Sequence, residues 1–449
     1  MRKIIPILLL CLLLTACGQT TPTPTPEPTA APTPEASVTV EPIAAETEAA
    51  GMSGFDYGAS AALPALTSSE AAEKVRSDGE AVYLFATNVG KGDALVLRCG
   101  DWIGLIDTGK TWARGRVDQA LAVMGSSFRA EDSYRLDAVF LTHTDDDHVG
   151  GLKWMTVQDG RIPNRAIEAL YASAMYTGVK EGKHPAVQAM GGAQWLKRGD
   201  EVPLGDSGAV LKVLAPASRY TDKDDNNSLV MMLESPQGRI LLAGDMELPE
   251  EAELLNQGDD LSCAVLKVPN HGDDDTTSAQ FANACAAQIA VVSTDSQQKP
   301  GTPDPGVVSR LEAAGSQVVV TEDSGLGILV TLKNGVATAE AVDFPYPAVS
   351  GLSIARVDAS DDTITLQNTS DKAIGLLGMY LYSDKGNEMY VFADESLDPG
   401  ATLTVGTNST EGDYDLLWDD KKVINKKKTD MIYLDDDCGR LIDWMGNGK

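Results

Sequence analysis

The fold is decided by one stretch of the sequence, Leu141-Thr142-His143-Thr144-Asp145-Asp146-Asp147-His148-Val149-Gly150-Gly151. It follows an apolar run at residues 136–141 that predicts a buried strand, so its polar residues lie on a loop just past a strand end. Imidazoles and carboxylates at this spacing can converge on one or two divalent cations, and the two glycines allow a tight turn beside them. The chain has only 4 histidines and two of them fall here, which disfavours an acidic surface loop with chance histidines. The stretch predicts a metal site.

The surrounding sequence alternates between strand-like and helix-like patterns. Strands are predicted at residues 81–85, 94–97, 102–106, 136–141, 228–233, 239–243, 288–292 and 318–320, and helices at 117–124 and 307–314. The pair 228–233 and 239–243 reads as a hairpin around Gln237-Gly238. Strands mixed with helices on this scale predict an α/β domain with helices covering sheets, which we assign to residues 78–343.

Near residue 350 the sequence pattern changes to short segments in which apolar and polar residues alternate, separated by turn signals. Strands are predicted at residues 354–357, 363–367, 379–382, 389–392, 402–405 and 431–434. This spacing predicts a C-terminal all-β, immunoglobulin-like sandwich over residues 350–449.

The N-terminus has the features of a targeting signal. Arg2-Lys3 precede an apolar run at residues 4–14 that is too short to span a bilayer, and Leu14-Thr15-Ala16-Cys17 follows. This ending resembles a bacterial lipobox, which implies that Cys17 is lipidated and that the protein is held on the extracytoplasmic face of the cell membrane; a plain secretory signal is the alternative. Residues 18–50 are rich in proline and threonine and predict a disordered linker.

The net charge of −30, from 36 basic and 66 acidic residues, excludes a broad basic surface for nucleic acid. An acidic protein can still hydrolyse a phosphodiester if bound metal supplies the local positive charge.

Several motifs along the chain resemble the metallo-β-lactamase superfamily, and within it the ComEC-like branch of competence and DNA-uptake proteins. The family's sequence His-x-(His/Asp)-x-Asp-His matches residues 143–148. In the family's order, the other matching stretches are Asn88-Val89-Gly90-Lys91-Gly92-Asp93-Ala94 for Asp-Val-Gly-Gln-Gly-Asp-Ala, Leu105-Ile106-Asp107-Thr108-Gly109, Asn226-Asn227-Ser228-Leu229-Val230, Leu242-Ala243-Gly244-Asp245-Met246-Glu247 and Leu266-Lys267-Val268-Pro269-Asn270-His271-Gly272.

This resemblance implies an αββα sandwich and a site for two divalent cations, zinc or manganese. His143 and Asp145 would hold one metal, Asp147 and His148 the second, with Asp245 bridging them and His271 completing the set of ligands of the second metal. Asp147 and Asp245 would be the catalytic carboxylates, and a metal-activated hydroxide would attack a phosphorus or carbonyl centre. An aspartate at position 145, where many relatives carry histidine, moves the preference from zinc towards manganese.

The chain departs from the family pattern at several points. The paired histidines of the family are Asn270-His271 here, and a later Gly-His-Pro is Gly301-Thr302-Pro303. Asp273-Asp274-Asp275 follow His271 and would oppose a long polyanion; alternatively, one of them replaces a missing histidine as a ligand. Lys267 and Asn270 are candidate substrate contacts, although an exposed strand-end lysine is the plainer interpretation of Lys267.

The C-terminal region resembles a lamin tail domain, through Leu366-Gln367-Asn368-Thr369-Ser370, Leu397-Asp398-Pro399-Gly400, Trp418, and the two stretches at residues 428–434 and 437–443. Such a domain implies a module that binds a cell-surface ligand or positions the enzyme.

Together these features favour a lipid-anchored, metal-dependent hydrolase, most plausibly a phosphodiesterase or nuclease acting on a small phosphodiester or on nucleic acid. The competing hypothesis is a surface binding protein whose metallo-β-lactamase fold has lost activity, motivated by the absent histidines at Asn270 and Thr302. Fold alone does not choose a substrate.

Overall fold

The computed structural model describes residues 62–126, 135–155, 166–176, 192–220, 225–420 and 422–448. In the first domain, apolar strands that are buried on both faces form the centre. Alternate residues of β2 (Val82–Thr87) belong to different cores: Val82 and Leu84 pack between two sheets, whereas Tyr83 and Phe85 pack against helices on the outer face. With both faces covered, the strand is apolar throughout instead of alternating with polar residues. Cys17 and residues 18–50 lie outside the described residues.

The first sheet has nine strands in the order β1-β18-β17-β2-β3-β4-β6-β8-β9. Its other strands are β1 (Ala65–Thr67), β3 (Leu95–Cys99), β4 (Trp102–Ile106), β6 (Ala138–Leu141), β8 (Leu170–Ser173), β9 (Gln194–Leu196), β17 (Gly327–Lys333) and β18 (Val336–Asp343). Because β1 pairs in parallel with β18, the domain begins earlier than the predicted boundary at residue 78.

The second sheet has seven strands in sequence order. They are β10 (Glu201–Pro203), β11 (Val210–Ala215), β12 (Val230–Ser235), β13 (Gly238–Leu242), β14 (Val265–Lys267), β15 (Ile289–Val292) and β16 (Gln317–Val320). A two-stranded ladder of β5 (Arg135–Leu136) and β7 (Ala166–Ile167) completes the domain.

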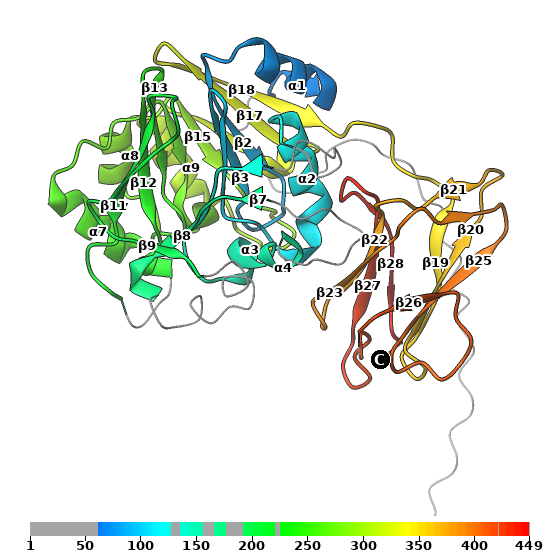
Figure 1. The fold of residues 1–449 in the computed structure, drawn as a ribbon. Coiled ribbons are helices and arrows are strands. Elements are labelled where there is room, and N and C mark those ends of the chain that lie inside the picture. Colours follow the sequence, from blue (N-terminus) through cyan, green and yellow to red (C-terminus); the bar gives the residue numbers. More distant parts are fainter. Residues whose placement is uncertain are drawn as a thin grey trace, which may run out of the picture. The chain divides into compact units, whose positions relative to one another are not determined.

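Helices cover the outer faces of the two sheets (Figure 1). They are α1 (Ser68–Ser77), α2 (Arg114–Val123), α3 (Asp146–Val149), α4 (Leu152–Met155), α7 (Leu248–Gln257), α8 (Ala279–Cys285) and α9 (Pro305–Ala313). The first four pack on the nine-stranded sheet, and the apolar faces of the last three meet the seven-stranded sheet. This is the expected αββα sandwich.

The C-terminal region is an all-β sandwich, as predicted. One sheet has the order β19-β20-β25-β26 and the other β23-β22-β27-β28, and they enclose a separate apolar core. The strands are β19 (Leu352–Asp358), β20 (Thr363–Asn368), β21 (Ile374–Gly375), β22 (Tyr380–Ser383), β23 (Glu388–Val391), β24 (Ser396–Leu397), β25 (Thr402–Thr407), β26 (Leu416–Trp418), β27 (Met431–Asp435) and β28 (Leu441–Gly446). The prediction omitted β21, β24, β26 and β28.

The sandwich and the first domain belong to one compact unit that begins at residue 50. The Arg116 guanidinium donates to the carbonyl of Gly439 (2.9 Å), and the Tyr380 hydroxyl donates to the carbonyl of Trp112 (2.7 Å). A Cβ on Gly115 would lie 2.3 Å from the backbone nitrogen of Gly439, so glycine is needed at this contact.

Parallel pairing brings the ends of several strands together. In β4 and β6, Ile106 pairs with Phe140, so the loops that follow these strands are neighbours. In β13, β14 and β15, residues Leu242, Lys267 and Val291 are in register. Polar residues just beyond these ends therefore converge on one edge of the domain.

A buried ion pair joins the two sheets near this edge. Lys267, at the end of β14, is fully buried, and its ammonium lies 2.8 Å from a carboxylate oxygen of Asp93, which precedes β3. The ammonium also donates to the carbonyl of Val268 (2.9 Å). The expectation that Lys267 contacts substrate is therefore wrong: in a sandwich closed on both faces, its side chain points into protein.

We expect Lys267→Met to lower the free energy of unfolding by roughly 3–5 kcal/mol, because the Asp93 carboxylate is left buried without its counter-ion. Urea denaturation measures the loss, and the Lys267→Met/Asp93→Asn double variant should recover part of it. An unchanged unfolding midpoint in the single variant would contradict a structural role.

Candidate metal centre

The loop after β6 places its metal-binding side chains through one short helical turn. Asp145 has an extended backbone and precedes α3, and its carbonyl accepts from the backbone N–H groups of His148 (2.8 Å) and Val149 (2.9 Å). The turn buries Asp147 and His148. Gly151 is required behind it, because a Cβ there would lie 2.2 Å from the carbonyl oxygen of Thr108.

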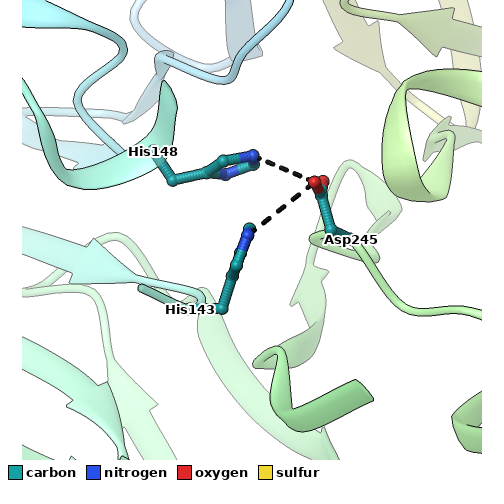
Figure 2. Close-up of side chains that lie close together, drawn as sticks. All are labelled: His143, His148 and Asp245. Carbon is teal, nitrogen blue, oxygen red and sulfur yellow. Dashed lines mark ion pairs between the residues drawn. The ribbon is translucent and has the colours of Figure 1, made fainter. Parts of the chain in front are cut away.

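His143, His148 and Asp245 form the centre of the site (Figure 2). Both imidazoles point at the Asp245 carboxylate, at 3.8 Å from His143 Nε2 and 3.2 Å from His148 Nε2. Asp245 comes from the turn after β13, where its backbone N–H donates to the Ser228 hydroxyl (3.1 Å). All three side chains are buried.

His271 and Asp147 close one side of this centre. His271 Nε2 lies 3.0 Å from the Asp245 carboxylate, 3.4 Å from His148 Nε2 and 3.9 Å from the Asp147 carboxylate. His271 and Asn270 both have left-handed backbones, with φ of 55° and 41°. Two consecutive non-glycine residues in this region store backbone strain, a feature that concentrates at functional sites.

Asp145 and His143 face a fourth carboxylate, which the sequence analysis missed. Ligand atoms of His143, Asp145 and Asp225 lie within 4.8 Å of one another, and Asp225 Oδ1 is 4.0 Å from His143 Nε2. Asp225 directly precedes the Asn226-Asn227-Ser228 motif, which was the available signal. The structure thus brings together all six predicted ligands and adds Asp225.

Outer hydrogen bonds fix how the histidine rings point. His148 Nδ1 lies 2.8 Å from Asp107 Oδ2, and His271 Nδ1 lies 2.8 Å from the carbonyl oxygen of Ser293. In a neutral ring, both acceptors place the proton on Nδ1 and leave Nε2 with the lone pair that a metal needs.

Unpaired buried atoms are a second reason why the residues of this centre fit divalent cations. Among the described residues, the buried atoms His143 Nε2 and Asp245 Oδ1 have no hydrogen-bond partner. Buried polar atoms are rarely left unsatisfied, so both call for a ligand at this centre.

Electrostatics in the site couple the imidazoles to the carboxylates. Burial alone would lower the pKa of His148, but the Asp245 and Asp107 carboxylates outweigh it and hold that pKa well above its ordinary value. Burial would raise the pKa of Asp245, yet His148 and His271 hold it well below its ordinary value. Burial, and secondarily His148, lowers the pKa of His143. A cation would compete with protons here, since metal ligands bind in the deprotonated form.

The positions where the chain departs from the family pattern are also accounted for. The Thr302 hydroxyl lies 2.7 Å from the Thr294 hydroxyl, so it is occupied in protein packing. Asn270, a predicted substrate contact, lies in the His271 turn and is only 9% exposed. Asp273 is ion-paired with Lys299 (2.9 Å), and no potential metal cluster within the described segments includes Asp273, Asp274 or Asp275.

Two lysines at the edge of the site were not predicted. The Lys91 ammonium lies 2.6 Å from Asp147 Oδ2. Lys110 follows the Asp107-Thr108-Gly109 turn, and its ammonium donates to the Gln298 side-chain oxygen (3.1 Å). The signal for Lys91 was its place in Gly90-Lys91-Gly92, where the family pattern has glutamine.

The chain is similar to two known protein families and to solved structures. The family model of the metallo-β-lactamase superfamily matches residues 88–284, and that of the lamin tail domain matches residues 345–449. The metallo-β-lactamase-fold protein YhfI from Bacillus subtilis is 12% identical, with a TM-score of 0.35, over 57% of this chain and 99% of that one.

Two curated relatives are competence proteins. ComE operon protein 3 of Bacillus subtilis is 27% identical over 58% of this chain and 34% of its own length. Competence protein ComA of Neisseria gonorrhoeae is 28% identical over 53% of this chain and 30% of its own length. The chain thus spans about a third of the length of these relatives. It contains a metallo-β-lactamase superfamily domain, followed by a lamin tail domain, and is similar in sequence to part of each of these competence proteins.

Proposed function

We propose that this protein is a metal-dependent phosphodiesterase. The observation that carries the proposal is the convergence of three imidazoles and four carboxylates (Asp145, Asp147, Asp225 and Asp245) on one largely buried centre. Four carboxylates balance the charge of two divalent cations, and this oxygen-rich set suits manganese or zinc.

Divalent cations bound here would activate water and stabilise the charge that develops on a phosphoryl oxygen. The residues of the chain have separate tasks. Asp107 and the Ser293 carbonyl orient His148 and His271, and the Asp245 carboxylate, which faces all three imidazoles, would be a metal ligand. The competence proteins among its relatives favour a nucleotide or nucleic-acid substrate.

The rival function is a binding protein of the same fold without activity, favoured by the absent histidines at Asn270 and Thr302. Metal analysis of the purified protein separates the two: two equivalents per chain support the enzyme, and none supports the binding protein. In the binding protein, the lamin tail domain would have the main role by binding a cell-surface ligand.

The proposed location is the extracytoplasmic face of the cell membrane, through lipid on Cys17. The support is the sequence Leu14-Thr15-Ala16-Cys17 after a basic start and a short apolar run. Within the described ranges, no helix is long and apolar enough to span a membrane.

Replacing Cys17 with serine should move the protein from the detergent phase to the aqueous phase, because the acylated residue is lost. Phase partitioning followed by immunoblotting measures this, with Cys11→Ser inside the apolar run as the control. Unchanged partitioning of the Cys17 variant would contradict the lipid anchor.

Asp245→Asn should lower phosphodiesterase activity by roughly 100-fold or more, since even outer partners of metal ligands cost about 10- to 100-fold. The variant should also bind less metal while its far-UV circular dichroism stays native. Asp260→Asn, which removes an exposed carboxylate paired with Arg239, is the matched control. Full activity of the Asp245 variant with manganese would exclude the two-metal assignment.

A third prediction concerns the acidic rim formed by Asp273 and Asp274. These carboxylates act on an entering polyanion within a Debye length of about 8 Å at physiological salt. The Asp273→Asn/Asp274→Asn variant should cleave single-stranded DNA about threefold faster at low salt, with less gain at high salt, because screening weakens the repulsion. Its metal content should be unchanged. Loss of metal in this variant would instead make one of these aspartates a ligand.

A further inference from the structure

Lys91 is fixed beside the metal centre by a loop packed on the metal-binding turn. A Cβ on Gly92 would lie 2.6 Å from the carbonyl oxygen of Asp147, and the backbone N–H of Asp93 donates to that same oxygen (3.2 Å). The glycine-flanked loop therefore lies directly against the turn, and it holds the Lys91 ammonium on the Asp147 carboxylate.

Lys110 lies nearby without a carboxylate partner. Within the described residues, its ammonium donates to the neutral Gln298 side chain and lies in no ion pair. Burial, opposed by Asp147 and reinforced by Lys91, lowers the pKa of Lys110, so both groups lie within electrostatic range of it. A partly buried ammonium without a counter-ion is costly, and in a chain with a net charge of −30 it is a candidate anion contact.

Lys110 and Gln298 line a cavity of about 730 Å³ together with Tyr382 and Tyr433 of the lamin tail domain. The two tyrosines are cross-strand partners, with ring centroids 6.3 Å apart. Four carboxylates also line the cavity, those of Asp146, Asp295, Asp384 and Asp435. Asp384 is paired with Lys385 (2.5 Å), and Asp295 accepts from Gln298 (2.9 Å). The volume is in the range of small-molecule sites, roughly 300–1,000 Å³.

We propose that Lys110, with Lys91, binds phosphoryl oxygens of a nucleotide-sized phosphodiester, whose base lies in this cavity against Tyr433. The inference rests on the proposed function and names its substrate class. The Lys110 ammonium and the Tyr433 ring line the same cavity, and Lys91 lies within electrostatic range of Lys110, which matches a phosphate joined to a planar base. The mixed charge and limited volume of the cavity disfavour duplex DNA.

Direct binding tests the site independently of turnover. Isothermal titration calorimetry on the metal-loaded full chain uses inorganic phosphate and thymidine 5′-monophosphate as probes. Lys110→Gln should lower the affinity for both probes by about tenfold or more, because a charge-assisted hydrogen bond is lost. Tyr433→Ala should lower the affinity for the nucleotide and leave the affinity for phosphate unchanged. Lys299→Gln, which removes a nearby ammonium already paired with Asp273, is the matched control and should change neither by more than about twofold.

The outcomes separate this inference from the proposed function. Equal binding by wild type and Lys110→Gln, or no binding of either probe to the wild type, overturns the inference. Equal weakening by Lys110→Gln and Lys299→Gln also overturns it, since that pattern is general electrostatics. If the binding pattern holds but no phosphodiester is hydrolysed with zinc or manganese, the inference stands as a nucleotide-binding site and the phosphodiesterase proposal fails.

Discussion

The carboxylate of Asp107 is the constraint on which the metal centre depends. One of its oxygens accepts from the backbone N–H of Thr142 (2.8 Å), and the other from the Thr142 hydroxyl (2.7 Å) and His148 Nδ1 (2.8 Å). These bonds tie the end of β4 to the end of β6 and fix the ring of His148. Asp107 itself has a φ of 56°, a left-handed conformation that costs roughly 1–2 kcal/mol. Packing and the three hydrogen bonds offset this cost, so the strain is compensated where the ligands must be held rigidly.

Buried histidines and carboxylates need such a scaffold because each is costly to bury alone. The two sheets supply it from opposite sides: the loop after β6 carries His143 and His148, and the turns after β13 and β14 carry Asp245 and His271. The Lys267–Asp93 pair joins those sheets just behind the site. The contacts between the two sheets therefore stabilise the fold and also hold the side chains of the centre in place.

The sequence was sufficient for the sandwich and for the six side chains that converge on the candidate centre, because buried strands and a closely spaced His/Asp motif are local signals. It was not sufficient where tertiary contacts decide. The hairpin of β17 and β18 was absent from the predictions although Asn334-Gly335 is a turn signal, because its period-two pattern is weak in a strand buried on both faces. Lys267 was misassigned for a related reason: a motif gives the order of residues, but not whether a strand-end side chain faces solvent. Asp225 and Lys91 reach the site only through folding of separate loops.

The lamin tail domain is physically connected to the site. The Arg116 guanidinium donates to the carbonyl of Asn88 (2.8 Å), at the start of the loop that carries Lys91, and to Gly439 of the C-terminal sandwich (2.9 Å). Arg116 is held further between the rings of Trp112 and Phe344. A displacement of the sandwich would therefore pull on the same loop that packs against Asp147. Because the backbone N–H of Asp93 in that loop donates to the carbonyl of Asp147, a chain of contacts joins the second domain to the candidate metal-binding turn, and the same domain lines the cavity beside it.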